Sequence, residues 1–199
     1  TSYDYDAPIS EWGTTTSKYF ELRNMMQRFN GGKKLPAIPK ANPMIKISKF
    51  KLNEYAPLES NLPQAVRSAD IKTMEELNMG WGAMIYRVVL PEVNGSSLLQ
   101  INEPHDFAQI FVDGKYIGKL DRVKGEKELY LPPVKKGSIL TVYIEAMGRI
   151  NFGRAIKDYK GITKDVQLKY EKDGNEYVCI LKNWEITCIP DDYQTAVNS

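Results

Sequence analysis

The stretch FAQIFVDGKYIGKL, residues 107–120, indicates the fold class because it predicts a β-hairpin. Two short runs rich in Ile, Phe and Tyr flank the pair Asp113-Gly114, and Asp and Gly both tolerate the positive φ angles of a tight hairpin turn. The pair Asp173-Gly174 gives the same signal later in the chain. Two such hairpins favour an all-β domain.

Short apolar runs separated by turn residues continue on both sides of this hairpin. Their length and their content of Ile, Val and Tyr are typical of β-strands. We expect strands at residues 45–52, 83–90, 97–101, 107–112, 116–120, 128–131, 139–146, 166–170, 177–181 and 184–189. Strands at this spacing predict a mainly β fold, a sandwich or jelly roll, rather than a helical or parallel α/β domain.

One amphipathic helix is predicted before the β region, at residues 18–29 (KYFELRNMMQRF). Its apolar stripe at helical spacing comprises Tyr19, Leu22, Met26 and Phe29. Residues 15–17 supply candidate N-caps, and the Asn-Gly-Gly of residues 30–32 predicts where the helix stops. Residues 31–43 carry two Gly, three Pro and three Lys without periodicity, which indicates a linker.

Composition and charge argue against two classes of partner. The 199 residues include 27 Lys and Arg against 25 Asp and Glu, a formal charge of +2, and the basic residues are scattered. We therefore expect no nucleic-acid partner. No apolar run reaches the ~18–20 residues of a membrane-spanning helix, so no membrane span is expected. The chain lacks a starting Met, which suggests a cut from a longer protein.

Nucleophilic and metal chemistry find little support in the sequence. His105 is the only histidine, and it is predicted to be a loop imidazole hydrogen-bonded to a neighbour. Cys179 and Cys188 match no common zinc pattern. Small buried hydrophobes are the favoured interpretation of both, with a single disulfide as the alternative. No residue cluster has metal-ligand spacing, so we expect no metal and no cofactor.

Paired carboxylates are the remaining catalytic candidates, since a glycosidase uses two of them, about 5–5.5 Å apart for retention or farther apart for inversion. Asp4 and Asp6 form the only inviting pair, because alternate residues of a strand face the same side. Turn and cap roles at a strand end are the favoured interpretation of both. Glu54 and Glu176 each lie in an Asn-Glu-Tyr tripeptide, a match too short to indicate function.

Tryptophan side chains offer a different chemistry, because aromatic faces stack on sugar rings. The candidates are Trp12, Trp81 and Trp184. Trp184 falls in a predicted strand, and a place in the sandwich core is favoured for it. For Trp81, which lies between Gly80 and Gly82, core packing and sugar stacking stay equally open.

Three stretches of the chain carry a family resemblance. They are TSYDYDAPISEWG at residues 1–13 with the helical stretch that follows, GWGAMIYRVVLP at 80–91, and VYIEAMGRINFGRAIKDYKGI at 142–162. Together, in this order and spacing, they resemble the family 35 glycoside hydrolases, which are β-galactosidases, over nearly the whole chain. The stretch AQIFVDGKYIG at 108–118 is shared more widely by galactose-binding-like sandwiches of glycosidases.

The resemblance implies a galactose-binding-like jelly-roll β-sandwich, residues 44–199, joined by a linker, residues 31–43, to the last strand and helix of a (β/α)₈ barrel, residues 1–30. The family's acid/base and nucleophile are glutamates on earlier barrel strands, upstream of Thr1. Such barrels carry their catalytic groups at strand ends. The chain is therefore expected to be the non-catalytic portion of a retaining exo-β-galactosidase, inactive alone. Its parent binds a β-galactoside or a galactose-containing glycan.

The resemblance also implies individual site residues. The second tyrosine of TSYDYDA lines the galactose pocket in the family, and that position is Tyr5 here. Asp4 becomes a neighbouring structural acid. The stretch GRINFG has Phe152 where the family commonly has Tyr, which removes a hydroxyl. Structural roles are favoured over substrate roles for Arg149, Asn151 and Phe152.

A binding module and a homodimer are the remaining hypotheses. The rival function is an independent carbohydrate-binding β-sandwich, for which a stacking role of Trp81 is the discriminating feature. The predicted helix has no ring of barrel strands to cover in this chain. A homodimer through residues 15–30 is therefore expected, because exposed apolar stripes favour self-association.

Overall fold

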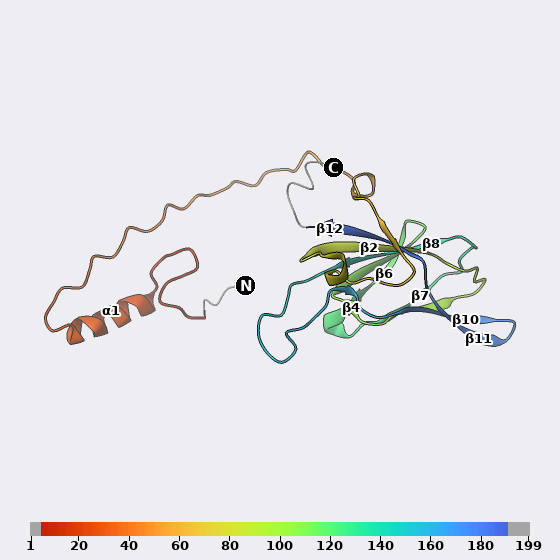
Figure 1. The fold of residues 1–199 in the computed structure, drawn as a ribbon. Coiled ribbons are helices and arrows are strands. Elements are labelled where there is room, and N and C mark those ends of the chain that lie inside the picture. The colour runs from red at the N-terminus through yellow and green to blue at the C-terminus, as the bar shows by residue number, and fades with distance from the viewer. Residues whose placement is uncertain (1–4, 191–199) are drawn as a thin grey trace. The chain divides into compact units, whose positions relative to one another are not determined.

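A computed structural model describes residues 5–190, and the chain divides into two compact units with the boundary between Glu54 and Tyr55 (Figure 1). The first unit contains one α-helix, and the second contains all the strands found in residues 5–190. These strands pair in antiparallel sheets. The prediction of a mainly β fold is confirmed.

The predicted helix of the first unit is confirmed as α1, Ser17–Phe29. The chain after it folds back beside its last turn, because Gln27 Nε2 donates to the Lys33 carbonyl at 2.9 Å and Gln27 Oε1 accepts from the Leu35 amide at 3.2 Å. Within residues 5–54, no side chain of α1 is buried, and Phe29 is 84% exposed. Of the apolar stripe of α1, Met26 and Phe29 are thus exposed in this unit, whereas Tyr19 and Leu22 are half-buried.

The strand predicted at residues 45–52 is wrong. Residues 33–57 form no helix or strand, and the apolar side chains of residues 45–52, such as Ile45 and Leu52, are largely exposed. A run of strand-forming residues is not sufficient, because a strand also needs a neighbour whose backbone groups complete its ladder. No strand that the structure describes pairs with this segment.

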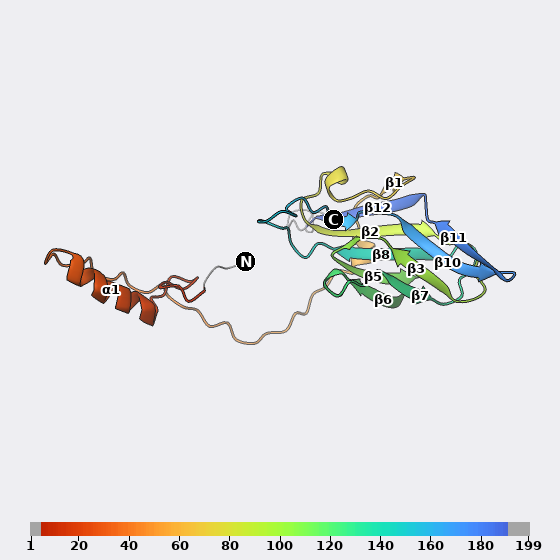
Figure 2. The ribbon, with the colours of Figure 1, turned by 90° about the horizontal axis from the view of Figure 1, so that it is seen from below.

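The second unit is a sandwich of two sheets (Figure 2). The larger sheet has the strand order β1-β12-β2-β8-β5-β6, with the bounds Val66–Ser68, Trp184–Pro190, Gly82–Val89, Ile139–Glu145, Phe107–Val112 and Lys115–Asp121. The smaller has the order β11-β10-β3-β7, with the bounds Asn175–Ile180, Val166–Lys172, Ser97–Ile101 and Glu128–Leu131. Separately, β4 (Pro104–His105) pairs with β9 (Gly161–Ile162). The short 3₁₀ helices are η1 (Leu58–Ser60), η2 (Glu75–Leu77) and η3 (Arg122–Lys124).

The strands predicted from residue 83 onward are all present, with ends shifted by at most a few residues. Both predicted hairpins are confirmed. Asp113 and Gly114, with φ of 48° and 75°, join β5 to β6, and Asp173 and Gly174, with φ of 53° and 74°, join β10 to β11. The elements β1, β4 and β9 were not predicted, because strands of two or three residues are too short to have a period.

Alternate residues of the facing strands fill the space between the two sheets. The fully buried side chains include Leu99 of β3, Ile110 of β5 and Val142 of β8. Trp184 of β12 is 1% exposed, its indole N–H donates to the Leu181 carbonyl at 3.0 Å, and its ring meets that of Tyr86 edge-on. The core position predicted for Trp184 is confirmed.

A close contact joins the larger sheet to the start of β9. The buried Tyr86 hydroxyl donates to the Lys72 carbonyl at 2.8 Å and accepts from the Ile162 amide at 3.1 Å. Gly161 has φ of 90°, and a Cβ atom there would collide with this hydroxyl. Residue 161 therefore has to be glycine for two reasons: its φ angle is positive, and a side chain would take the space of the Tyr86 hydroxyl.

The two cysteines are free and half-buried. Cys179 lies on β11 of the smaller sheet and Cys188 on β12 of the larger one, and both pack against the core. Burial raises the pKa of the Cys188 thiol. The alternative of a single disulfide is therefore wrong, and both residues serve as small apolar groups at the edge of the core.

Candidate functional site

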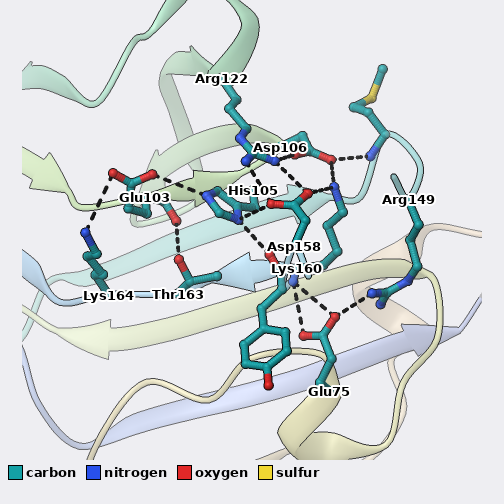
Figure 3. Close-up of polar contacts among 12 residues, drawn as sticks. Glu75, Glu103, His105, Asp106, Arg122, Arg149, Asp158, Lys160, Thr163 and Lys164 are labelled. Atoms are coloured by element: carbon teal, nitrogen blue, oxygen red, sulfur yellow. Dashed lines mark hydrogen bonds and ion pairs between the residues drawn. The ribbon is translucent and has the colours of Figure 1, made fainter. Parts of the chain in front are cut away.

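Residues 146–160 connect β8 to β9 as a long arch without helix or strand, and a network of hydrogen bonds and ion pairs holds its two ends (Figure 3). This segment contains the stretch GRINFG and most of the third family-like motif. We call it the arch.

The first end of the arch is fixed by Arg149. Its Nε donates to the Gly80 carbonyl and its Nη1 to Glu75 Oε1, both at 2.6 Å. Glu75 also accepts from the Lys160 backbone amide at 3.1 and 3.2 Å, so one carboxylate holds both ends of the arch. Burial acts to raise the pKa of Glu75, but the hydrogen bonds from Arg149 and Lys160 outweigh it and hold the pKa below its ordinary value. The structural role favoured for Arg149 thus has a physical basis.

The second end of the arch is fixed by a closed ring of four charges. The Lys160 ammonium, on a side chain 2% exposed, lies 2.6 Å from Asp106 Oδ2 and 2.8 Å from Asp158 Oδ2. The Arg122 guanidinium contacts Asp106 Oδ1 at 2.6 Å and binds both oxygens of Asp158, at 2.8 and 2.9 Å. Asp106 Oδ2 also accepts from the Met147 amide at 3.0 Å. Every oxygen of the two carboxylates has a donor.

The ring keeps both of its carboxylates ionised. Hydrogen bonds from Arg122 hold the pKa of Asp158 well below its ordinary value, against the opposing effect of burial. For Asp106, burial is the largest influence and raises the pKa, but the bonds from Lys160 and Arg122 outweigh it and the net pKa is lowered. Hydrolysis by the two-carboxylate mechanism needs one protonated carboxyl and one available carboxylate. The ring is therefore a structural clamp and not a catalytic pair.

His105 lies beside the ring. Its Nδ1 is 2.6 Å from the Tyr159 carbonyl and its Nε2 is 3.3 Å from Glu103 Oε2. The predicted hydrogen bond to a neighbour is confirmed, although the residue lies in β4 and is buried rather than on a loop. Glu103 in turn binds Lys127 Nζ at 2.7 Å, and this bond lowers the pKa of Glu103 to about 2.

Between its fixed ends the arch presents apolar side chains to solvent. Phe152 is 88% exposed, and Met147 and Ile156 are more than half exposed. Trp81 is 68% exposed and lines a pocket of about 500 Å³ together with Tyr143 and other residues of the sheet and arch. Core packing of Trp81, one of the two alternatives left open, is wrong. Phe152 likewise contributes nothing to the core of this unit.

The other predicted site residues belong to the first unit. Tyr5 is 80% exposed. Asp6 has a positive φ, and its carboxylate pairs with Lys18 Nζ of α1 at 3.2 Å, in keeping with a turn role. Asp4 lies outside the described residues, and so does the start of the proposed barrel strand. Tyr5 and Trp81 thus belong to different units of the chain.

Sequence reasoning missed the charged ring, although one signal was available. Asp158 and Lys160 flank Tyr159, and alternate residues of an extended chain face the same side. Asp106 and Arg122 had no such signal, because only the fold brings them to the arch. In residues 5–190, no group of three or more His, Cys, Asp or Glu side chains is arranged to hold a metal ion, and no helix has the length and apolar character to cross a membrane.

Comparison with known proteins gives two family matches. Residues 72–190 match the family model of the first all-beta domain of beta-galactosidase, and residues 1–29 match that of the glycosyl hydrolases family 35. The whole chain is 36% identical to a beta-galactosidase of Bos taurus and 35% identical to one of Homo sapiens, covering 30% and 29% of their lengths. A beta-galactosidase of Mus musculus is 30% identical over 94% of this chain and 28% of its own length. The chain thus spans less than a third of these relatives.

Replacing Lys160, the buried cation of the ring, should strongly lower the free energy of unfolding. Lys160→Met leaves Asp106 and Asp158 short of one positive partner in a buried site, and we expect a loss of about 3–5 kcal/mol in the free energy of unfolding. Urea unfolding followed by tryptophan fluorescence measures it. The control is Lys164→Met, whose side chain is 64% exposed and should change stability by less than about 0.5 kcal/mol. If both substitutions change the free energy of unfolding by the same small amount, the charged ring does not act as a structural clamp.

Proposed function

Because the chain belongs to the family of beta-galactosidase first all-beta domains, we propose that it is the non-catalytic portion of a retaining exo-β-galactosidase. The parent enzyme removes terminal β-linked galactose from a β-galactoside or a galactose-containing glycan. The observation that carries this proposal is the match of residues 72–190, which include every strand of the sandwich except β1. The match of residues 1–29 to family 35 supports the assignment of the parent.

The proposal assigns no hydrolytic chemistry to the chain itself. The family resemblance puts both catalytic glutamates on barrel strands upstream of Thr1. In the second unit, the buried carboxylates of Asp106 and Asp158 are fully engaged by Lys160 and Arg122. A carboxylate held in this way is not available as a nucleophile or as a proton donor.

We keep the division into a barrel remnant (1–30), a linker (31–43) and a sandwich (44–199) as part of the proposal. The end of α1 at Phe29 supports the first boundary. The absence of a strand at residues 45–52 removes one argument for placing the second boundary at 44. The proposed homodimer through residues 15–30 is supported by the uncovered apolar side chains of α1, such as Phe29.

Tyr5 is proposed to line the galactose pocket of the parent. Its side chain is 80% exposed in this chain. A tyrosine in a sugar pocket contributes an apolar ring face and a hydroxyl that hydrogen-bonds the sugar. The assignment rests on the position of Tyr5 in the motif TSYDYDA.

The second candidate function is an independent carbohydrate-binding module, and the exposure of Trp81 favours it. Trp81 opens onto the pocket of about 500 Å³ that Tyr143, Glu145 and Arg149 also line. An exposed indole beside planar polar groups is the kind of surface that stacks on a sugar ring. We rank this candidate second because the two family matches together point to a domain of a larger hydrolase.

The first proposal predicts that the 199-residue chain does not hydrolyse an aryl β-galactoside, because the two required carboxylates lie outside it. The assay is release of the aryl alcohol by purified chain. Turnover that survives purification and is abolished by Asp6→Asn would show that a pair containing Asp6 is catalytic after all.

In the intact parent, Tyr5→Phe should lower kcat/KM by about ten- to a hundredfold, because the sugar hydroxyl then loses its hydrogen-bond partner. Steady-state kinetics on an aryl galactoside measures this change. Tyr55→Phe, at a tyrosine that is 90% exposed and outside the TSYDYDA motif, is the matched control and should leave kcat/KM unchanged. Equal kinetics of the two variants would refute the pocket role of Tyr5.

For Trp81, we expect titration calorimetry of the chain with galactose to reveal no binding tighter than millimolar. One exposed indole without a surrounding set of hydrogen bonds gives too little free energy for tighter binding. A clear isotherm that is lost in Trp81→Ala and kept in Trp12→Ala, another exposed tryptophan, would establish the binding module instead.

A further inference from the structure

The outer face of the larger sheet, on the side away from the core, carries a groove. A pocket of about 670 Å³ lies over β2, β8 and β5, and Leu58 and Glu59 of η1 also line it. The pocket of about 500 Å³ beside Trp81 shares Tyr143 and Glu145 with it, so the two are continuous. The strand β8 lines this hollow over its whole length, about 20 Å at the usual rise of about 3.3 Å per residue. We call the hollow the outer groove.

An aromatic ring and a polar group recur side by side along the outer groove. The register of β5 against β8 pairs Phe111 with Thr141. Two residues away on each strand, it pairs Gln109 with Tyr143, and residues two apart on a strand face the same side. Side chains paired in this way lie within contact distance of one another. At the end of the groove Trp81 supplies a third ring, so rings and hydrogen-bonding groups alternate along it.

The polar groups beside these rings are free to bond a ligand. In the part of the chain that the structure describes, the side chains of Gln109, Thr141 and Tyr143 have no hydrogen-bond partner, and all three are half-buried. Burial and the nearby Glu145 carboxylate raise the pKa of Tyr143, so its hydroxyl keeps its hydrogen at neutral pH and can donate. The Glu145 carboxylate is exposed and accepts hydrogen bonds. Four groups on two strands thus offer donors and acceptors to a molecule in the groove.

The charges of the larger pocket disfavour an anionic ligand. Its cation is Arg87, and Arg87 Nη2 lies 2.6 Å from Glu59 Oε2, so the positive charge is already paired. Two further acids, Asp113 and Glu145, line the same pocket. An anion there would meet more negative than positive charge. The outer groove therefore favours a neutral ligand over a phosphorylated, sulfated or carboxylated one.

A peptide is a poorer match for this surface than a sugar chain. An extended peptide adds to a sheet through backbone hydrogen bonds at an edge. The strand β8 lies between β2 and β5 and pairs with both, so its backbone groups are already used. A sugar ring has an apolar face of C–H groups that stacks on an aromatic ring, and a rim of hydroxyls that donate and accept hydrogen bonds. That combination matches the alternation of rings and polar groups in the outer groove.

We propose that the outer groove binds a neutral oligosaccharide. Its sugar rings stack on Phe111, Tyr143 and Trp81, and its hydroxyls bond the polar groups beside those rings. The proposal deepens the second candidate function, because Trp81 becomes one end of an extended site instead of the whole of it. A single galactose reaches one ring only, which agrees with the weak binding expected for it.

Titration of the full chain with a β-linked galactose tetrasaccharide tests the groove. We expect a dissociation constant below about 1 mM, at least about tenfold tighter than that of galactose, because the tetrasaccharide engages several rings. Amide ¹H–¹⁵N spectra should place the binding shifts at β2, β8 and β5. A tetramer of galacturonic acid, with one carboxylate on each ring, should bind at least about tenfold more weakly.

The choice of galactose rests on the proposed function of the parent, so cellotetraose, an equally neutral chain of glucose, is titrated beside it. Binding of either tetrasaccharide along β2, β8 and β5 supports the outer groove. Binding of cellotetraose alone counts against a galactoside-acting parent and leaves the groove standing.

Tyr143→Ala should raise the dissociation constant at least about tenfold, whereas Tyr130→Ala, at a 71% exposed tyrosine of β7 in the smaller sheet, should leave it unchanged. Gln109→Ala keeps every ring and should raise the constant about three- to tenfold through one lost hydrogen bond. The amide spectrum of each variant reports its folding, and Gln109→Ala decides the matter if Tyr143→Ala does not fold. The proposal is refuted if neither neutral tetrasaccharide shifts the signals of β2, β8 and β5, if the galacturonic acid tetramer binds as tightly as they do, or if Tyr143→Ala and Tyr130→Ala bind them alike.

Discussion

The buried ammonium of Lys160 needs negative partners, and the placement of the arch depends on meeting that need. Removing such a charge from water is costly unless carboxylates replace the lost hydration. Asp158 comes from the arch itself and Asp106 from the residue after β4, and Arg122 balances the second negative charge. The ring thereby fastens the arch to the open end of the β5–β6 hairpin, where the Arg122 amide also donates to the Asp106 carbonyl at 3.0 Å. The arch can then hold apolar residues such as Phe152 in solvent without collapsing onto the core.

Most of the sandwich could be predicted from the sequence because its information is local. Apolar alternation marks a strand of five to eight residues, and an Asp-Gly pair fixes the register of the hairpin on either side of it. The prediction failed at residues 45–52, where a strand-like run of residues has no partner strand, and it missed β1, β4 and β9, whose two or three residues have no period. Whether a strand finds a partner depends on two segments, so the sequence pattern of one segment cannot predict it.

The candidate site was less predictable for the same reason. Tyr5 was predicted as a site residue from its motif, and Trp81 from its aromatic side chain. The structure shows that Trp81 is exposed, which excludes the core position left open for it. The charged ring and the contacts of His105 join residues 103–106, 122 and 158–160. The pairing of β4 with β9 brings residues 103–106 to residues 158–160, and the β5–β6 hairpin brings Arg122 to Asp106. His105 was expected to bond a neighbour, and it does, but the neighbour is the carbonyl of Tyr159 across that ladder. No spacing rule reaches across the fold in this way.

The position of β12 has a consequence for how the chain is made. In residues 5–190 it is the last strand along the chain, and in the larger sheet it lies between the short edge strand β1 and β2 and pairs with both. During synthesis β2 leaves the ribosome long before β12 exists, and at about 5–20 residues per second the wait lasts about 5–20 s. Through that interval one backbone edge of β2 has no ladder, and its apolar residues, among them Met84 and Tyr86, lack the cover of Trp184 and Ile186. The sandwich is therefore a domain whose folding completes only after translation of its final strand, and a nascent-chain chaperone has a defined segment to shield until then.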